Sequence, residues 1–201
     1  MHSIKTNLPA NLKAFVLTMD DSAHPLFQQY MEIRDFHYVE KHHWTKEGVD
    51  EFDEFSTFVV LVQDNTVLVA GRVVHDSREA DLPIRLVLRE AGKPTSQIPQ
   101  GSVEISRFGV NPKLLGTRDV NRLLGAFVNV IADYCEASNI RDIFAVLISI
   151  LERRFSHMSH LKVERLSDGV MTTHGTSEFH TVRLIPKKWE VNSFLPFQQV
   201  A

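Results

Sequence analysis

Three polar side chains interrupt a segment that otherwise has the composition of a β-strand. The segment Val103–Val110 carries Glu104, Ser106 and Arg107 among β-forming residues. Because side chains alternate along a strand, we expect Glu104 and Ser106 on one face and Arg107 on the other, unless a bulge redirects the arginine. A buried carboxylate, hydroxyl and guanidinium need polar partners, so these groups either satisfy one another or serve a substrate.

The hydrophobic pattern predicts that this segment belongs to a mixed sheet. Apolar runs rich in β-branched residues predict strands over 13–18, 57–62, 67–74, 102–110, 143–148, 162–166 and 179–185. Asp64-Asn65 predicts a hairpin turn, and residues 75–101 predict a loop with a short helix. Apolar spacings of three and four predict helices after a cap at Asp21 or Ser22, over 120–131 and over 150–157. This order predicts one α/β domain over residues 1–201, with a sandwich built around the sheet.

Composition and charge exclude several classes of function. The net charge of −3 gives no sign of polyanion binding, so nucleic acid is not a predicted partner. The single cysteine, Cys135, fits a reducing compartment. The first residues lack the apolar core of a signal peptide, and no apolar run approaches the roughly 20 residues of a membrane span. We therefore predict a cytoplasmic protein without membrane insertion. The histidine pairs His42/His43 and His157/His160 lack metal-ligand patterns, so no metal is predicted.

Several short segments, in order, resemble the motifs of acyl-homoserine-lactone synthases, a family of GNAT-like acyltransferases. They are Arg34-Asp35-Phe36-His37-Tyr38-Val39-Glu40 followed by Trp44, then Asp50-Glu51-Phe52-Asp53, Gly71-Arg72 and Val103-Glu104-Ile105-Ser106-Arg107-Phe108. Tyr38 stands where that family usually has Phe. The resemblance covers roughly residues 30–110. Leu82-Pro83 and His174-Gly175 are more similar to a sister group, the N-acyl amino acid synthases.

The resemblance implies a GNAT-like α/β/α sandwich around a mixed, centrally splayed β-sheet. It implies transfer of a fatty-acyl chain from the phosphopantetheine thioester of acyl carrier protein to an amine, with no tightly bound cofactor. The expected acceptor is S-adenosylmethionine, which would yield an acyl-homoserine lactone signal for quorum sensing. The alternative is an amino acid acceptor, such as an aromatic one. A small-group acetyltransferase using acetyl-CoA and an inactive acyl-binding module are further alternatives.

The same resemblance assigns roles to residues of this chain. Glu104 is the expected base, acting through a water. Ser106 either orients a bound group or only bonds to the backbone, and Arg107 holds the donor phosphate or orders the site. The substrate-binding set is Arg34, Tyr38, Trp44, Asp50, Asp53, Arg72 and Phe108. Arg34 and Trp44 would close over the substrates from a partly mobile segment within residues 1–56. The structural alternatives are that Glu104 only pairs with an arginine, that the two aspartates only cap or solvate a loop, and that Trp44 is a core anchor.

The segment Lys113–Arg118 occupies the position of the GNAT phosphate loop. Lys113, Gly116 and Arg118 are the expected donor-binding residues, and backbone amides at the start of the following helix could hold a phosphate. Arg118, with Lys113, could equally contact an acidic acyl carrier protein, which is the predicted macromolecular partner. The oligomeric state is not predicted.

Overall fold

The computed structural model describes residues 1–4, 8–41, 48–77, 81–117, 119–166, 170–171 and 178–187. Its strands are β1 (His2–Ser3), β2 (Lys13–Leu17), β3 (Ser56–Gln63), β4 (Thr66–His75), β5 (Val103–Val110), β6 (Ile143–Ile148), β7 (Leu161–Arg165), β8 (Val170–Met171) and β9 (Glu178–Pro186). Its α-helices are α1 (Pro25–Asp35), α2 (Pro83–Glu90), α3 (Val120–Ala137) and α4 (Ser149–Ser156). The seven strands predicted from the sequence are confirmed, and β1 and β8 are two-residue strands that the pattern did not reveal.

The described strands form one mixed sheet in the order β1-β2-β3-β4-β5-β6-β9-β7, with β8 pairing with β9. Every neighbouring pair is antiparallel except β5 and β6. The tight β3–β4 turn has positive φ at Asp64 (48°) and Asn65 (62°), which suits the right-handed twist of a hairpin. The sequence predicted this turn correctly.

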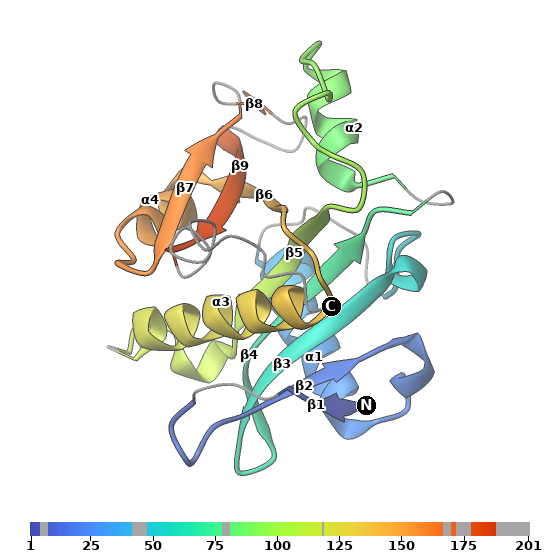
Figure 1. Ribbon diagram of the computed structural model, residues 1–201. Helices are drawn as coiled ribbons and strands as arrows, with labels where there is room; N and C mark the ends of the chain where they lie inside the picture. The colour runs from blue at the N-terminus through green and yellow to red at the C-terminus, as the bar shows by residue number, and fades with distance from the viewer. Residues whose placement is uncertain are drawn as a thin grey trace, which may run out of the picture.

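Helices cover both faces of the sheet, as Figure 1 shows for α3 in front and α1 behind. On the α3 face, alternate residues of the central strands join α3 in the largest apolar cluster. The opposite face carries two separate clusters, one under α1 and one under α2. Polar residues of β4 and β5 lie on this divided face, so the gap between α1 and α2 is the place where charged groups can gather.

The parallel strands β5 and β6 separate part of the way along their length. Only Val103–Ile105 pairs with Ile143–Ala145, although β5 continues to Val110 and β6 to Ile148. The two strands therefore leave a V-shaped opening in the middle of the sheet, since β5 stays paired with β4 and β6 with β9. The centrally splayed sheet predicted from the resemblance is confirmed.

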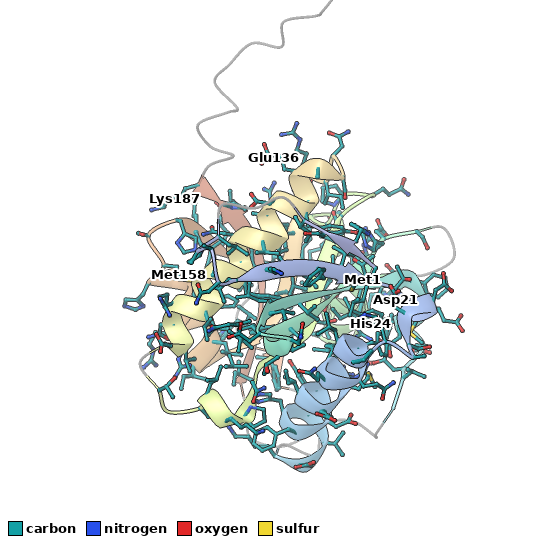
Figure 2. The ribbon with its side chains drawn as sticks, turned by 90° about the horizontal axis from the view of Figure 1, so that it is seen from below. Met1, Asp21, His24, Glu136, Met158 and Lys187 are labelled. Carbon is teal, nitrogen blue, oxygen red and sulfur yellow. The ribbon has the colours of Figure 1, made fainter. Side chains whose placement is uncertain are left out.

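The predicted cap of the first helix was wrong. His24, not Asp21 or Ser22, precedes α1, and its Nδ1 accepts the Leu26 N–H at 3.1 Å. Asp21 instead accepts the Thr18 N–H at 3.0 Å and lies 2.9 Å from the amino group of Met1. Figure 2 shows Met1, Asp21 and His24 beside one another at this edge of the molecule. The Asp21 carboxylate, which the sequence pattern predicted as a helix cap, therefore forms a tertiary ion pair with the amino group of Met1 instead.

No α-helix in the described part of the chain has the length and apolar character needed to cross a membrane. Among the same residues, no three His, Cys, Asp or Glu side chains gather as metal ligands would.

Candidate active site

A β-bulge in β5 places Arg107 on the same side of the sheet as Ser106. Ala70 pairs with Gly109 and Arg72 with Ser106, so Arg107 and Phe108 together face the single residue Gly71. Arg107 adopts a left-handed backbone conformation, with φ of 48°. A non-glycine residue in this region costs about 1–2 kcal/mol, which the surrounding packing must offset. The simple alternation expected from the sequence is therefore broken, and the bulge is what redirects the arginine.

Gly71 makes room for this bulge. A Cβ at position 71 would lie 2.7 Å from Phe108 Cβ and 2.9 Å from Phe127 Cζ, distances that real Cβ atoms do not tolerate. The glycine opposite the bulge therefore lets β4 and β5 stay paired while Phe108 turns toward the α3 face.

Two arginines and two aspartates form the charged cluster, defined here as Arg34, Asp50, Asp53 and Arg72. Arg34 and Asp53 are paired through Nη1, with distances of 3.1 Å to Oδ1 and 2.8 Å to Oδ2. Arg34 Nη2 lies 3.1 Å from Asp50 Oδ2. Arg72 Nη1 donates to Asp53 Oδ1 at 2.7 Å and makes a short contact with Asp50. Arg34, Arg72 and Asp53 are each 1% exposed, so each buried charge depends on its partners.

The aspartates are held by their own loop as well. The Asp50 N–H donates to Asp53 Oδ2 at 2.7 Å, and the Phe52 N–H donates to Asp50 Oδ1 at 3.0 Å. Burial alone would raise the pKa of Asp50, but the charges of Arg72 and Arg34 lower it below the ordinary value. The Arg72 guanidinium also lies 5.7 Å from the centre of the Phe52 ring. Asp50 and Asp53 therefore accept hydrogen bonds from their own loop and also contact Arg72.

Ser106 contacts this cluster and lies on the same strand and face as Glu104. Arg72 Nε donates to Ser106 Oγ at 3.0 Å, which leaves the hydroxyl proton of Ser106 available as a donor. Glu104 lies two residues earlier on the same face and is 2% exposed. Its Oε2 accepts the Ile84 N–H at 2.6 Å. Glu104 therefore occupies the N-terminus of α2, whose own N-cap residue, Leu82, has no side-chain acceptor.

Burial raises the pKa of Glu104 to about 7, although the Ile84 N–H and the charges of Arg72 and Arg107 act in the opposite direction. A carboxyl group with this pKa exchanges its proton near neutral pH, as a general base must. Among the described residues, no arginine forms an ion pair with Glu104, whose hydrogen bond goes to the Ile84 N–H.

Tyr38 fixes the guanidinium of Arg107. The Tyr38 hydroxyl donates to the Phe108 carbonyl at 3.0 Å, and Arg107 lies 5.2 Å from the centre of the Tyr38 ring. Burial raises the pKa of Tyr38 to about 12, so the hydroxyl stays protonated and remains a donor. Arg107 Nη2 also lies 3.3 Å from Asp50 Oδ2.

A cavity of about 320 Å³ lies at the V-shaped opening. The predicted residues that line it are Tyr38, Arg72, Glu104, Ser106, Arg107 and Phe108; the others are Phe52, Pro83, Val87, Val146, Ile148, Leu151 and Phe179. Pro83 and Val87 belong to α2 on one face, whereas Phe108 and Leu151 pack with the α3-side core. The cavity therefore passes through the sheet between β5 and β6, with its polar groups on the β5 side.

Other predicted residues lie apart from this cavity or outside the described residues. Lys113 and Gly116 belong to the turn before α3 and do not line the cavity. Trp44 and Arg118 lie outside the described residues. The sequence analysis did not identify the cavity wall from α2, α4 and β9, because its members are ordinary apolar residues. Only Pro83 gave a local signal, as a proline at the first position of a helix.

The sequence matches no protein-family model and no curated protein. Solved structures are similar over most of the chain. The acyl-homoserine-lactone synthase LasI matches with a TM-score of 0.69 and 15% identity, over 88% of this chain and 90% of LasI. BjaI, a CoA-dependent acyl-homoserine lactone synthase solved with S-adenosylmethionine and isopentyl-CoA, matches with a TM-score of 0.66 and 14% identity, over 96% and 87%. FeeM, an N-acyl amino acid synthase from uncultured soil microbes, matches with a TM-score of 0.56 and 14% identity, over 92% and 97%.

The chain has the GNAT-like acyltransferase fold. The predicted fold and the predicted likeness to both synthase groups are confirmed by these structures. Identities of 14–15% establish the shared fold alone.

Proposed function

We propose that this protein is an N-acyltransferase that moves an acyl chain from a thioester to the amine of a small acceptor. The observation that carries the proposal is Glu104, a carboxyl group with a pKa of about 7 on the wall of a cavity that crosses the sheet. An ammonium has no lone pair, so the acceptor must first lose a proton, and Glu104 would take it through a water.

The reaction needs no covalent enzyme intermediate. The acceptor nitrogen attacks the thioester carbonyl, a C–N bond forms, and the C–S bond breaks to release the thiol. The proton lost from nitrogen passes to Glu104 and then to solvent or to the leaving thiolate. The Ser106 hydroxyl would donate a hydrogen bond to the tetrahedral oxyanion, because its oxygen already accepts a hydrogen bond from Arg72. The apolar wall from β6, α4 and β9 would hold the acyl chain.

The proposed donor is an acyl chain on acyl carrier protein. The helix α4 turns Leu151 toward the cavity and leaves Arg153 and Arg154 exposed on its outer surface. A basic helix beside the cavity suits an acidic carrier, although the chain as a whole has a net charge of −3. Acyl-CoA is the competing donor, since two structurally similar synthases are CoA-dependent.

Two acceptors are proposed, S-adenosylmethionine and a free amino acid. The first would be acylated and then lactonised with loss of methylthioadenosine. The second is supported by the size of the cavity, since about 320 Å³ is at the small end of the roughly 300–1,000 Å³ of ligand pockets. An amino acid and a short acyl chain need less room than S-adenosylmethionine and a long one.

The test combines donors with acceptors in a matrix. Purified protein is incubated with acyl carrier protein or CoA carrying chains of several lengths, and with S-adenosylmethionine or each amino acid. Mass spectrometry of the lipid extract identifies a lactone, an acyl amino acid or neither. Lack of any amide product with every pair would refute the proposed function.

A further inference from the structure

Arg85 of α2 holds its helix to one end of the sheet through a set of directed contacts. Its Nη1 and Nη2 donate to Asp76 Oδ1 and Oδ2 at 2.7 and 3.0 Å, which is the two-bond geometry of a strong arginine–carboxylate pair. Nη1 also lies 2.8 Å from Asp81 Oδ1. Nη2 donates to the carbonyl oxygens of Ile98 and Pro99 at 3.1 and 3.0 Å. The Arg85 side chain is 13% exposed and that of Asp76 is 7% exposed, so solvent and salt screen this pair weakly.

Asp76 is fixed in turn to the strands that carry Glu104. It directly follows β4, and its N–H donates to the Ser102 carbonyl at 3.1 Å. Its Oδ2 accepts the Gly101 N–H at 3.0 Å, just before β5 begins. Glu104 is the second residue of β5 and pairs with Val74 on β4. Asp76 and Glu104 are therefore parts of one hydrogen-bonded strand pair.

Two neighbouring residues of α2 thus contact this strand pair. Arg85 contacts Asp76, and the N–H of Ile84, the preceding residue, donates to Glu104 Oε2 at 2.6 Å. Because Ile84 and Arg85 are adjacent on one helix, the first contact limits how far the second can lengthen. The buried face of α2 also packs in the apolar cluster that includes Phe144 of β6. Such packing is non-directional, so it keeps the helix on the sheet without fixing its exact place there.

The charges that act on Glu104 come from the strands. Arg72 of β4 and Arg107 of β5 both favour the ionised carboxylate. Arg72 is itself paired with the two aspartates of the charged cluster. On the other side of β5, β6 places the apolar Phe144 opposite Glu104. The contribution of α2 is the Ile84 N–H, so Arg85 reaches Glu104 through the position of the helix rather than through its own charge.

We propose that Arg85 is a positioning residue, whose ion pair with Asp76 holds the Ile84 N–H against Glu104 and so sets how readily Glu104 takes up a proton. This inference rests on the proposed function for the role of Glu104 as the base, and it names a residue outside the cavity that tunes this base. The N–H favours the ionised carboxylate, so a longer hydrogen bond favours the protonated form. A residue that only stabilised the fold would change the free energy of unfolding and leave the proton affinity of Glu104 in the folded protein unaltered.

The test measures the Glu104 carboxyl group directly. Protein that is isotope-labelled at the glutamate side-chain carboxyl carbons is titrated by NMR, and the Glu104 signal is identified by its absence from E104Q. In R85Q the apolar packing should keep Glu104 buried while the hydrogen bond from Ile84 lengthens. The pH midpoint of the Glu104 signal should therefore rise by about half a pH unit or more. Hydrogen exchange at the Ile84 amide should be faster by about tenfold or more.

The matched control is R89Q, which removes the same charge from the same helix. Arg89 is exposed and pairs with Asp81 rather than with the strand pair, so this variant should leave the Glu104 midpoint unchanged. If R85Q does not fold, D76N tests the same ion pair, because its amide oxygen can still accept the Gly101 N–H. An unchanged or lower midpoint in the folded variant, or an equal rise in R89Q, overturns the proposal.

The kinetic readout separates this inference from the proposed function. The pH profile of kcat/KM, measured with the best donor and acceptor, should move in R85Q by the same amount as the NMR midpoint. If no acceptor is acylated, the proposed function fails, and the NMR titration still decides whether Arg85 positions Glu104. A shifted NMR midpoint with an unshifted kinetic profile would support the positioning and remove Glu104 as the base.

Discussion

Glu104 on β5 caps the helix α2 by accepting the Ile84 N–H at 2.6 Å. Glu104, the proposed base, thus also accepts a hydrogen bond from a backbone N–H in the first turn of α2. The N–H and the helix dipole favour the ionised carboxylate, whereas burial disfavours it more strongly, and the balance brings the pKa to about 7. The position of α2 therefore helps to set the proton affinity of Glu104.

Replacing Glu104 by Gln should remove the base without removing the cap. The amide oxygen of Gln can still accept the Ile84 N–H, so the fold should persist. We expect kcat to fall by about 10²–10⁴-fold, the usual contribution of general base catalysis. Steady-state kinetics with the best donor and acceptor would measure this, and circular dichroism would check the fold. Turnover within a few-fold of the wild type would exclude Glu104 as the base.

The rate of the wild type should depend on the protonation of Glu104. Its pKa of about 7 predicts that kcat/KM rises tenfold per pH unit below pH 7 and levels off above it. The acceptor amine adds its own pH dependence. The E104Q variant separates the two, because it should keep the acceptor's dependence and lose the one near pH 7. The same profile in both proteins would contradict the assignment.

The stability of the protein should respond to the same group in a defined direction. The pKa of Glu104 is raised from 4.5 to about 7 on folding, so between these pH values the folded protein keeps a proton that the unfolded chain releases. Stability from this group is therefore present below pH 4.5 and is lost as pH rises through 7. Relative to E104Q, the wild type should lose up to about 3 kcal/mol of unfolding free energy between pH 4.5 and 8. Urea denaturation at several pH values would measure the difference. A constant difference across this range would contradict the raised pKa.

Sequence patterns predicted those parts of the site that depend on local alternation. Glu104 and Ser106 fall on one face because strand side chains alternate, and the Asp64-Asn65 turn follows from residues that tolerate positive φ. The sequence alone could not establish the bulge, because arginine has no intrinsic preference for the left-handed conformation that Arg107 adopts. Its placement depends on the packing of Phe108 and on Gly71 across the strand. The cap of α2 by Glu104 joins residues that are 20 positions apart, so only the fold reveals it.

Replacing Gly71 by Ala should disturb the bulge and move Arg107. The added Cβ would meet Phe108 and Phe127 at less than 3.0 Å, so one of the strands must shift. We expect a loss of about 1–3 kcal/mol in stability, together with lower kcat/KM. G125A is the matched control, because Gly125 lies on α3 and does not line the cavity, and a Cβ there would lie 3.3 Å from the His160 ring. Thermal unfolding and kinetics would test both variants. A G71A variant with wild-type activity would show that the bulge does not position the site.

Asp53→Asn should be strongly destabilising. Asp53 is 1% exposed and contacts both Arg34 and Arg72, so the variant leaves these two buried guanidinium groups to share the single carboxylate of Asp50 within the charged cluster. Breaking a buried pair costs about 3–5 kcal/mol. Asp119→Asn removes a carboxylate that pairs with the exposed Arg122 and should cost less than about 0.5 kcal/mol. Denaturant titration would compare the two variants, and similar costs would show that the charged cluster contributes little to stability.

The ring of Phe155 should limit the length of acyl chain that the proposed enzyme accepts. Phe108 lines the cavity, and Phe155 of α4 stacks behind it, with ring centres 5.6 Å apart and planes at 24°. Phe155 is 2% exposed and belongs to the core on the α3 face, so it supports the wall against which a chain would end. Phe155→Leu should shorten this wall at a cost of about 1–2 kcal/mol in stability.

The chain-length profile of F155L should therefore move toward longer donors. Each additional methylene that finds apolar surroundings is worth about 0.8 kcal/mol, or about fourfold in kcat/KM. Competition assays with mixed-length donors and mass spectrometry of the products would measure the profile. L161A is the control, because Leu161 is buried in the same core but does not line the cavity. A shift of equal size in L161A would attribute the change to general loosening of the core, and an unchanged profile in F155L would place the end of the chain elsewhere.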